Sequence, residues 1–245
     1  MRRSSQSGMT LVEVLIAVTL VSLLSVGMLF AIRAGLSAME ASQRRISANR
    51  RAVSAQRILQ QQVAGFLQVK ARCGASPVAE GGTPEPFFQG TPAVLRFVTT
   101  FSLEGGSRGM PQIAELFVIP GVEGRGVRLV VNETPYFGPS GAGFLCLPRG
   151  PDPFTGTAGI RFPPPQPGPR SFVLADQLAY CRFLFLESFE TVPDRWVPVW
   201  TNADYWPRAI RVEMAPLEAD PVRVPPMSFT GIVRPNRMVQ EPYGF

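Results

Sequence analysis

Apolar residues fill the first part of the chain almost without a break, and the pattern then changes twice. Between residues 9 and 32 the only ionisable side chain is Glu13, and this run is long enough to cross a bilayer as a helix. From residue 33 to about residue 70, apolar positions recur at steps of three, four and seven, which is typical of a helix with one apolar face. Beyond residue 76, short apolar runs alternate with proline and glycine, which indicates strands and turns.

The two helical patterns are continuous, so they predict one helix of about 62 residues, roughly 90 Å long. The apolar stripe of its second half should be covered mostly by the protein's own sheet. This part of the stripe consists of Ile46, Val53, Leu59, Val63 and Phe66. We expect the helix to stop near Cys73 and Gly74, just before Pro77.

The remaining chain predicts an antiparallel sheet. Strand-like runs occupy residues 94–99, 113–119, 127–131, 178–186, 196–200 and 209–214. The glycine-rich residues 121–126 should form a turn that pairs the second run with the third. Residues 134–170 should be mainly loop, because the prolines within residues 162–169 cannot donate to a strand ladder. The expected class is α+β, one long helix packed on antiparallel sheet.

Composition argues against catalysis. The 245 residues include no histidine, which excludes a Ser-His-Asp triad, a Cys-His pair and a His-ligated metal. Carboxylates such as Glu187, Glu190 and Asp194 are spaced too loosely for a calcium loop. We therefore expect no enzyme activity, no metal and no cofactor.

The chain is basic, with 24 Lys and Arg against 18 Asp and Glu, but its arginines are scattered and form no stripe with aromatic residues. A nucleic-acid partner is therefore not expected. One stretch of the predicted helix does gather arginines, which form either a solvated face or a contact surface for acidic partner subunits or lipid head groups. They are Arg44, Arg45, Arg50, Arg51 and Arg57.

The N-terminus combines a short basic leader, a glycine and a carboxylate. Arg2 and Arg3 open a polar leader that ends in Gly8, and Glu13 is the fifth residue after that glycine. This arrangement resembles the prepilin signature of type IV pilins and type II secretion pseudopilins. A secretory signal peptide would place its cleavage site after the apolar run. A plain membrane anchor would have no use for a carboxylate that costs on the order of 2.5–3.5 kcal/mol at a helix centre.

Residues 173–178, the tryptophans that follow, and residues 206–214 (Trp-Pro-Arg-Ala-Ile-Arg-Val-Glu-Met) resemble the J-type minor pseudopilin of type II secretion, with Trp206 in place of the usual leucine. This resemblance implies a structural subunit near the tip of a pseudopilus that supports protein export across the outer membrane. The alternative is a minor type IV pilin at a pilus tip, with an assembly-priming or ligand-binding role.

The resemblance also implies how the chain matures. A prepilin peptidase would cut after Gly8 and N-methylate Met9, and Glu13 would pair with the new amino group of a neighbouring subunit. Residues 1–8 would be the leader, 9–32 the transmembrane half of the helix, 33–71 its amphipathic half and 72–245 a β-rich head. The protein would cross the bacterial inner membrane once, with a cytoplasmic N-terminus before cleavage and a periplasmic head. Its partners would be I-type and K-type minor pseudopilins and the major pseudopilin.

Three cysteines lie in the part of the chain expected in an oxidising compartment. Cys181 shares a strand face with Phe183 and Phe185, so we expect a buried free thiol. Cys73 and Cys146 both lie in loop-like surroundings and form the best of the three possible pairs, although spacing alone leaves the connectivity open.

Overall fold

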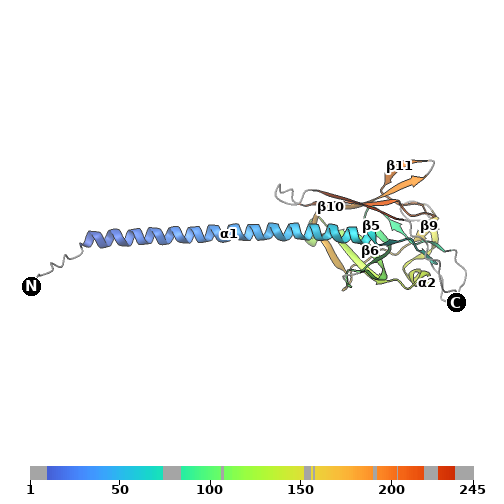
Figure 1. The fold of residues 1–245 in the computed structure, drawn as a ribbon, viewed down its shortest axis with the longest axis horizontal. Coiled ribbons are helices and arrows are strands. Elements are labelled where there is room, and N and C mark those ends of the chain that lie inside the picture. Colours follow the sequence, from blue (N-terminus) through green and yellow to red (C-terminus); the bar gives the residue numbers. More distant parts are fainter. Residues whose placement is uncertain are drawn as a thin grey trace, which may run out of the picture. The chain divides into compact units, whose positions relative to one another are not determined.

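The computed structural model describes residues 10–73, 84–105, 108–151, 156, 158–189, 192–202, 204–217 and 226–234. The chain divides into two compact units, Met1–Ala48 and Asn49–Phe245. Helix α1 (Leu11–Ala64) contributes residues to both (Figure 1). Its start is capped by Thr10, whose side-chain Oγ1 accepts the N–H of Glu13 at 3.4 Å. The Thr10 carbonyl accepts the N–H groups of Glu13 and Val14 at 3.1 and 3.3 Å.

Helix α1 ends at Ala64 and not at residue 71, so the predicted boundary of the amphipathic half lies too far along the chain. The next residue, Gly65, approaches strand β5 (Val94–Phe101) so closely that a Cβ atom there would lie 2.7 Å from Thr99 Oγ1. Its carbonyl accepts the N–H of Thr100 at 2.8 Å. The helix therefore ends here, and the chain pairs with the sheet as β1 (Phe66–Leu67). Strand pairing at these residues takes the place of further helical turns.

The second unit is built on a nine-stranded sheet in which each strand pairs antiparallel with its neighbours (Figure 1). The order along the sheet is β1-β5-β6-β7-β10-β12-β13, with β4 beside β5 and β11 beside β10. The strands are β4 (Gln89–Gly90), β5 (Val94–Phe101), β6 (Arg108–Pro120), β7 (Val127–Pro135), β10 (Phe172–Phe189), β11 (Val192–Val197), β12 (Ala209–Pro216) and β13 (Met227–Ile232).

The prediction of a long helix with an antiparallel sheet is confirmed. The predicted strands at 94–99, 113–119, 127–131, 178–186 and 209–214 lie inside β5, β6, β7, β10 and β12. The expected turn is the short helix η1 (Val122–Gly124), which joins β6 to β7. The run at 196–200 is wrong in part, because β11 ends at Val197.

Residues 134–170 contain more regular structure than the predicted loop. Two short helices, α2 (Pro139–Ala142) and η2 (Gly143–Leu145), precede a small hairpin of β8 (Leu147–Pro151) and β9 (Ala158–Arg161). Another two-stranded ladder joins β2 (Lys70–Ala71) to β3 (Glu85–Pro86). Each of these elements is only two to five residues long, which explains why no periodic pattern marked them.

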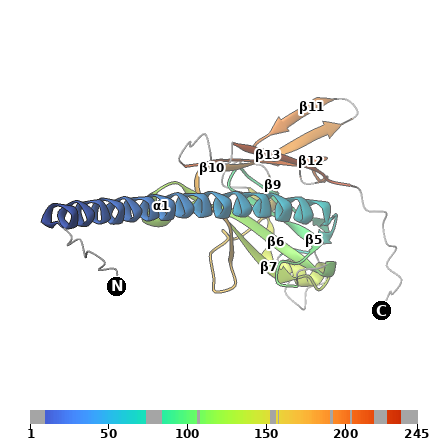
Figure 2. The ribbon, with the colours of Figure 1, turned by 60° about the vertical axis from the view of Figure 1, so that its left-hand side comes forward.

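The sheet curves around the C-terminal turns of α1, as Figure 2 shows. Strands β5 and β13 lie near opposite ends of the strand order, yet both contact this part of the chain. Gly65 meets Thr99 on β5, and a Cβ atom on Gly231 of β13 would lie 2.5 Å from Val63 Cγ1. The helix end therefore fills the concave side of the sheet and forms the centre of the main hydrophobic core.

Leu59, Val63 and Phe66 are almost completely buried in this core, and Phe66 stacks on Phe97 with 5.0 Å between ring centroids. The expected coverage is wrong for Val53, whose side chain is 63% exposed. In the described helix, burial begins only at Ala55, because the sheet covers just the last turns. The side chain of Ile46 lies outside the described part of the structure.

Candidate functional site

The N-terminal part of α1 is apolar on all sides. Residues 11–40 form the one helical stretch, among the described residues, that is long and apolar enough to cross a membrane. Every side chain from Thr10 to Glu40 is exposed. Exposure of so much continuous apolar surface to water is strongly unfavourable, so this segment requires lipid or apolar helices around it.

The hydroxyl groups in this segment are compatible with such an environment. Each donates a hydrogen bond, 2.8–2.9 Å long, to a carbonyl three or four residues earlier in the same helix. In hydrocarbon an unpaired polar group is costly, and these bonds remove that cost within the helix itself. The residues are Thr19, Ser22, Ser25 and Ser37.

Glu13 places a charge at the start of this apolar segment. It lies in the first turn of α1, its side chain is exposed, and its carboxylate is the only one between residues 9 and 32. The positive end of the helix dipole favours a negative charge at this position. A cationic group supplied from outside the chain would stabilise it further once water is removed. The predicted cleavage and methylation residues, Gly8 and Met9, lie outside the described residues.

A carboxylate in the head holds the end of α1 on the sheet. Glu133 on β7 accepts hydrogen bonds from Gln62 Nε2 of α1 at 2.8 Å and from the N–H of Leu103 at 2.8 and 2.9 Å. Thr99 on β5 donates its hydroxyl hydrogen to the carbonyl of Gln62 at 2.9 Å. The orientation of the helix end is therefore fixed by polar contacts as well as by the apolar core.

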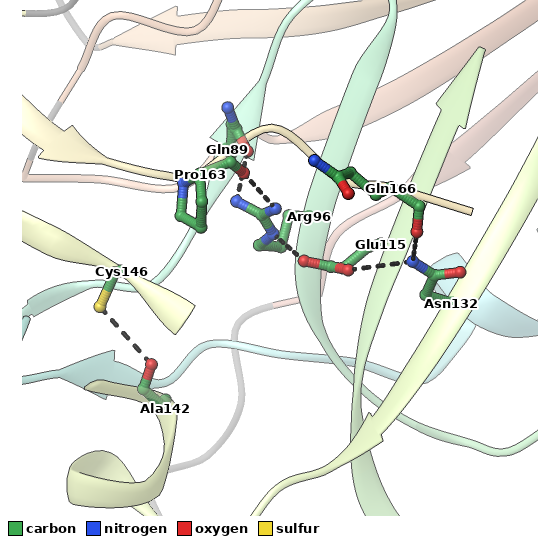
Figure 3. A network of polar contacts seen from close by, with 8 residues as sticks. All are labelled: Gln89, Arg96, Glu115, Asn132, Ala142, Cys146, Pro163 and Gln166. Atoms are coloured by element: carbon green, nitrogen blue, oxygen red, sulfur yellow. Dashed lines mark hydrogen bonds and ion pairs between the residues drawn. The ribbon is translucent and has the colours of Figure 1, made fainter. Parts of the chain in front are cut away.

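The opposite face of β5 and β6 carries a buried ion pair, shown in Figure 3. Arg96 Nε donates to Glu115 Oε1 at 2.6 Å, and the side chains of these two residues are 1% and 11% exposed. The guanidinium also donates to Gln89 Oε1 at 2.7 Å and to the carbonyl of Pro163 at 2.9 Å. Burial lowers the pKa of Arg96, and the adjacent carboxylate of Glu115 opposes that shift.

This ion pair fixes the proline-rich segment against the sheet. Arg96 binds the carbonyl of Pro163, and Asn132 Nδ2 donates to the carbonyl of Gln166 at 3.0 Å (Figure 3). The guanidinium carbon of Arg96 also lies 4.7 Å from the centre of the Phe162 ring. The segment is thus an extended connection, as its prolines predict, but it is anchored along its length. Sequence reasoning overlooked this network, although a charged residue at the centre of each apolar run, 94–99 and 113–119, was a usable signal.

Cys73 and Cys146 form a disulfide, with their Cα atoms 5.1 Å apart. The bridge joins the chain just after β2 to the end of η2, beside a second apolar cluster that includes Phe87 and Val98. Gly143 packs on the backbone here, because a Cβ atom would lie 2.5 Å from the carbonyl oxygen of Arg72. The bridge therefore ties the α2–η2 loop to the segment that follows the helix.

Cys181 is a buried free cysteine, and burial raises its pKa to about 12. It lies in the main core with Phe183 and Phe185, so its thiol behaves as a small apolar group. The described residues contain no group of three or more His, Cys, Asp or Glu side chains placed to hold a metal ion. Glu190 lies outside them.

The structure describes the side-chain exposure of the arginine-bearing part of α1 only in part. Arg57 is exposed. The side chains of the other four arginines, Arg44, Arg45, Arg50 and Arg51, lie outside the described part, although their backbone is helical. Their predicted role as a contact surface stays a prediction.

Comparison with known proteins gives one family match, at the N-terminus. Residues 3–29 match the model of the prokaryotic N-terminal methylation motif. No curated protein matches the chain by sequence. Among solved structures, a chain in the crystal structure of the GspK-GspI-GspJ complex from the enterotoxigenic Escherichia coli type 2 secretion system is similar, at 13% identity and a TM-score of 0.39, over 79% of this chain and 99% of that one.

The methylation motif overlaps the first turns of α1 and includes Gly8, Met9 and Glu13. The prediction of a prepilin-like N-terminus is confirmed by this match. The chain therefore carries, at residues 3–29, the N-terminal methylation motif of prepilin-like proteins, continuous with a helix that can span a membrane.

Proposed function

We propose that the protein is a minor pseudopilin of the J-type, a structural subunit near the tip of a type II secretion pseudopilus and not an enzyme. The observation that carries this proposal is the uncovered apolar helix with one carboxylate, Glu13, within a methylation motif. A helix of this kind is matched to a lipid bilayer before assembly and to neighbouring apolar helices afterwards. The resemblance of residues 206–214 to the J-type supports the choice among pseudopilins.

Maturation would create a cation with which the carboxylate of Glu13 could pair. Cleavage after Gly8 would leave an amino group on N-methyl-Met9, and that cation would lie in the same low-dielectric layer as the carboxylates of adjacent subunits. A buried carboxylate without a partner is costly, and a cation at the right stagger relieves that cost. Entry into the filament would therefore be favoured in one register. The chemistry would be done on this protein by the prepilin peptidase.

We also propose a location and partners for the protein. The apolar helix would anchor the chain once in the inner membrane, with the leader in the cytoplasm and the β-rich head that follows α1 in the periplasm. Arg2 and Arg3 support this orientation, since cytoplasmic flanks are enriched in positive charge. The partners would be I-type and K-type minor pseudopilins and the major pseudopilin, and none would be a nucleic acid.

Intact-mass analysis of the full chain from cells with and without the peptidase tests the proposal. With the peptidase, the mature protein should lack residues 1–8 and carry a methylated Met9. Gly8→Val should block the cut, because a β-branched side chain obstructs approach to the scissile backbone. A mature terminus near Ala34 would instead show ordinary signal-peptide cleavage and would contradict the proposal.

A second variant tests the assembly role of the carboxylate. Glu13→Val keeps the helix apolar and removes the charge, so it should retain membrane insertion but lose co-purification with the other pseudopilins through the membrane segments. Glu40→Val is the matched control, because Glu40 lies on the same helix outside the methylation motif. Equal recovery of partners with Glu13→Val and with the unmodified chain would contradict charge pairing.

A further inference from the structure

The face of β10, β12 and β13 that points away from the hydrophobic core carries polar side chains in register. Cys181, Phe183 and Phe185 of β10 point into the core, so the residues between them lie on the other side, called here the outer face. In one row across the outer face, Arg182 pairs with Glu213, which pairs with Ser228. The adjacent row consists of Leu184, Arg211 and Thr230.

The accessible charge on the outer face is positive. Arg182 Nη2 lies 2.7 Å from Glu213 Oε2, but the arginine side chain is 58% exposed whereas the glutamate side chain is only 19% exposed. Arg211 Nε donates to the neutral hydroxyl of Thr230 at 3.2 Å. The carboxylate is therefore largely covered, and the two guanidinium groups set the charge that a partner would meet.

Both guanidinium groups are held in place by aromatic rings. The Arg211 guanidinium carbon lies 3.9 Å from the centre of the Trp196 ring on β11, and that of Arg182 lies 5.6 Å from the centre of the Tyr180 ring. Stacking uses the face of a guanidinium, so its in-plane N–H groups stay available as donors. Arg182 directs Nε and Nη2 to the Glu213 carboxylate, whereas Arg211 directs Nε to the Thr230 hydroxyl. A partner carboxylate would therefore meet the terminal nitrogens of Arg211 and the Nη1 of Arg182. An arginine fixed in this way loses little side-chain entropy when it binds.

We propose that the outer face, centred on Arg182 and Arg211, binds a carboxylate-rich segment of a partner protein. Arginine, tryptophan and tyrosine are the residue types that contribute most to protein–protein binding energy, and this face holds all three. Apolar surface continues beside them, because Ile232 at the end of β13 is 70% exposed and Tyr180 is 42% exposed. The partner segment would thus combine Asp or Glu with apolar side chains.

The charge of the face argues against two other occupants. A second copy bound through the same face would bring arginines opposite arginines, which is unfavourable. Recognition of anionic lipid typically uses clusters of about four to eight Lys or Arg, whereas this face centres on Arg182 and Arg211. An acidic protein segment needs only a few well-placed donors, and it is the occupant that fits.

Site-specific photo-cross-linking of the full chain in its own cells tests the proposal. The photoreactive residue p-benzoylphenylalanine replaces Ile232, and the captured peptide is identified by mass spectrometry. We expect a cross-link to a segment rich in Asp and Glu on another protein. Arg182→Glu and Arg211→Glu should each reduce its yield at least about tenfold, whereas Arg125→Glu, an exposed arginine in the β6–β7 turn, should leave it unchanged.

Charge exchange then separates recognition from damage to the fold. Arginine in place of the captured carboxylates should restore the cross-link to Arg211→Glu, which an unfolded head would not allow. Capture of lipid, of a second copy or of this chain's own residues 218–225 or 235–245 would overturn the proposal, as would the absence of any cross-link or of rescue.

This inference rests partly on the proposed function, so a parallel strain carries the photoreactive residue at Leu15, in the apolar part of α1. Capture of pseudopilins at Leu15, without capture of an acidic segment at Ile232, would overturn the inference alone. No capture of pseudopilins at Leu15 would contradict the proposed function.

Discussion

Arg96 on β5 and Glu115 on β6 are direct cross-strand partners, and their ion pair is buried on the face of the sheet opposite the helix. Their neighbours Leu95, Phe97, Ala114 and Leu116 contribute to the main core. The two charged residues instead lie beneath the proline-rich segment, whose carbonyl at Pro163 the guanidinium binds. The main core thus packs on one face of these strands. On the other face the ion pair holds an irregular segment, beside the second apolar cluster that contains Val98 and Ile113.

Removal of one member of this pair should destabilise the head strongly. Arg96→Met leaves the Glu115 carboxylate buried without its cation, and loss of one partner of a buried ion pair typically costs about 3–5 kcal/mol in the free energy of unfolding. Arg96→Met combined with Glu115→Leu should recover most of this loss. Denaturant unfolding of the full chain in detergent, followed by tryptophan fluorescence, measures both changes.

A second ion pair provides the control. Arg128 and Asp176 form two hydrogen bonds of 2.9 Å on the protein surface, where solvent screens the attraction. Arg128→Met should therefore reduce stability far less than Arg96→Met. Similar losses for the two single variants would show that the buried pair has no special role.

Close packing of the helix end on β13 gives another prediction. Gly231→Ala places a Cβ atom 2.5 Å from Val63 Cγ1, so the helix or the strand must shift, at a cost of about 1–3 kcal/mol in the free energy of unfolding. Val63→Ala in the same chain should relieve part of that cost. Gly168→Ala, where no atom lies within 4 Å of the new methyl group, should be nearly neutral in the same unfolding experiment. A neutral Gly231→Ala variant would mean that β13 does not pack on α1.

Much of this architecture could be predicted from sequence because long elements leave periodic patterns. The apolar run and the helical period of α1 specify a helix wherever tertiary contacts do not favour another conformation. Five of the predicted apolar runs coincide with strands. The end of the helix could not be placed in the same way. Residues 65–71 continue its composition, and only the contact of Gly65 with Thr99 and Thr100, distant in sequence, turns them into the sheet.

The outer face also depends on contacts between residues that are distant in sequence, so it could not be predicted from local patterns. Arg182, Arg211 and Trp196 are far apart along the chain, and each is ordinary in an exposed strand. Their proximity depends on the register of β10, β11 and β12, which no local pattern determines. β13 was not predicted, because the Met227–Ile232 segment is short, contains a glycine and has prolines close to both ends. The candidate site in the membrane segment was easier to predict from sequence, because Glu13 is the only charged residue in an apolar run.

The three cysteines should differ in reactivity. With Cys73 and Cys146 joined, unfolding without a reductant should expose one thiol per chain, that of Cys181, and unfolding with a reductant should expose three. At pH 8 the native thiol should react slowly with a thiolate-specific reagent, because burial raises its pKa to about 12. Two or three reactive thiols before reduction would contradict the disulfide.

The same pKa shift has a consequence for stability. Because the folded state holds the Cys181 proton up to about pH 12 and the unfolded chain releases it near the ordinary value of 9.0, the folded state binds more protons between these values. Stability should therefore fall as pH rises from 9 toward 12. Cys181→Ala should remove this part of the pH dependence while other groups titrate as before.

The arginine-bearing stretch of α1 leads to the prediction that bears most directly on assembly. If Arg50 and Arg51 face partner subunits, their charge should steer association and set orientation more than it adds affinity. Arg50→Glu combined with Arg51→Glu should weaken a complex with I-type and K-type pseudopilins more at low salt than at high salt, because screening already reduces the attraction at high salt. Light scattering of full chains in detergent at two salt concentrations measures this, with unchanged head unfolding as the check on folding and Arg125→Glu as the charge-matched control. A stable homodimer that ignores the reversals would show instead that these arginines form a solvated helix face.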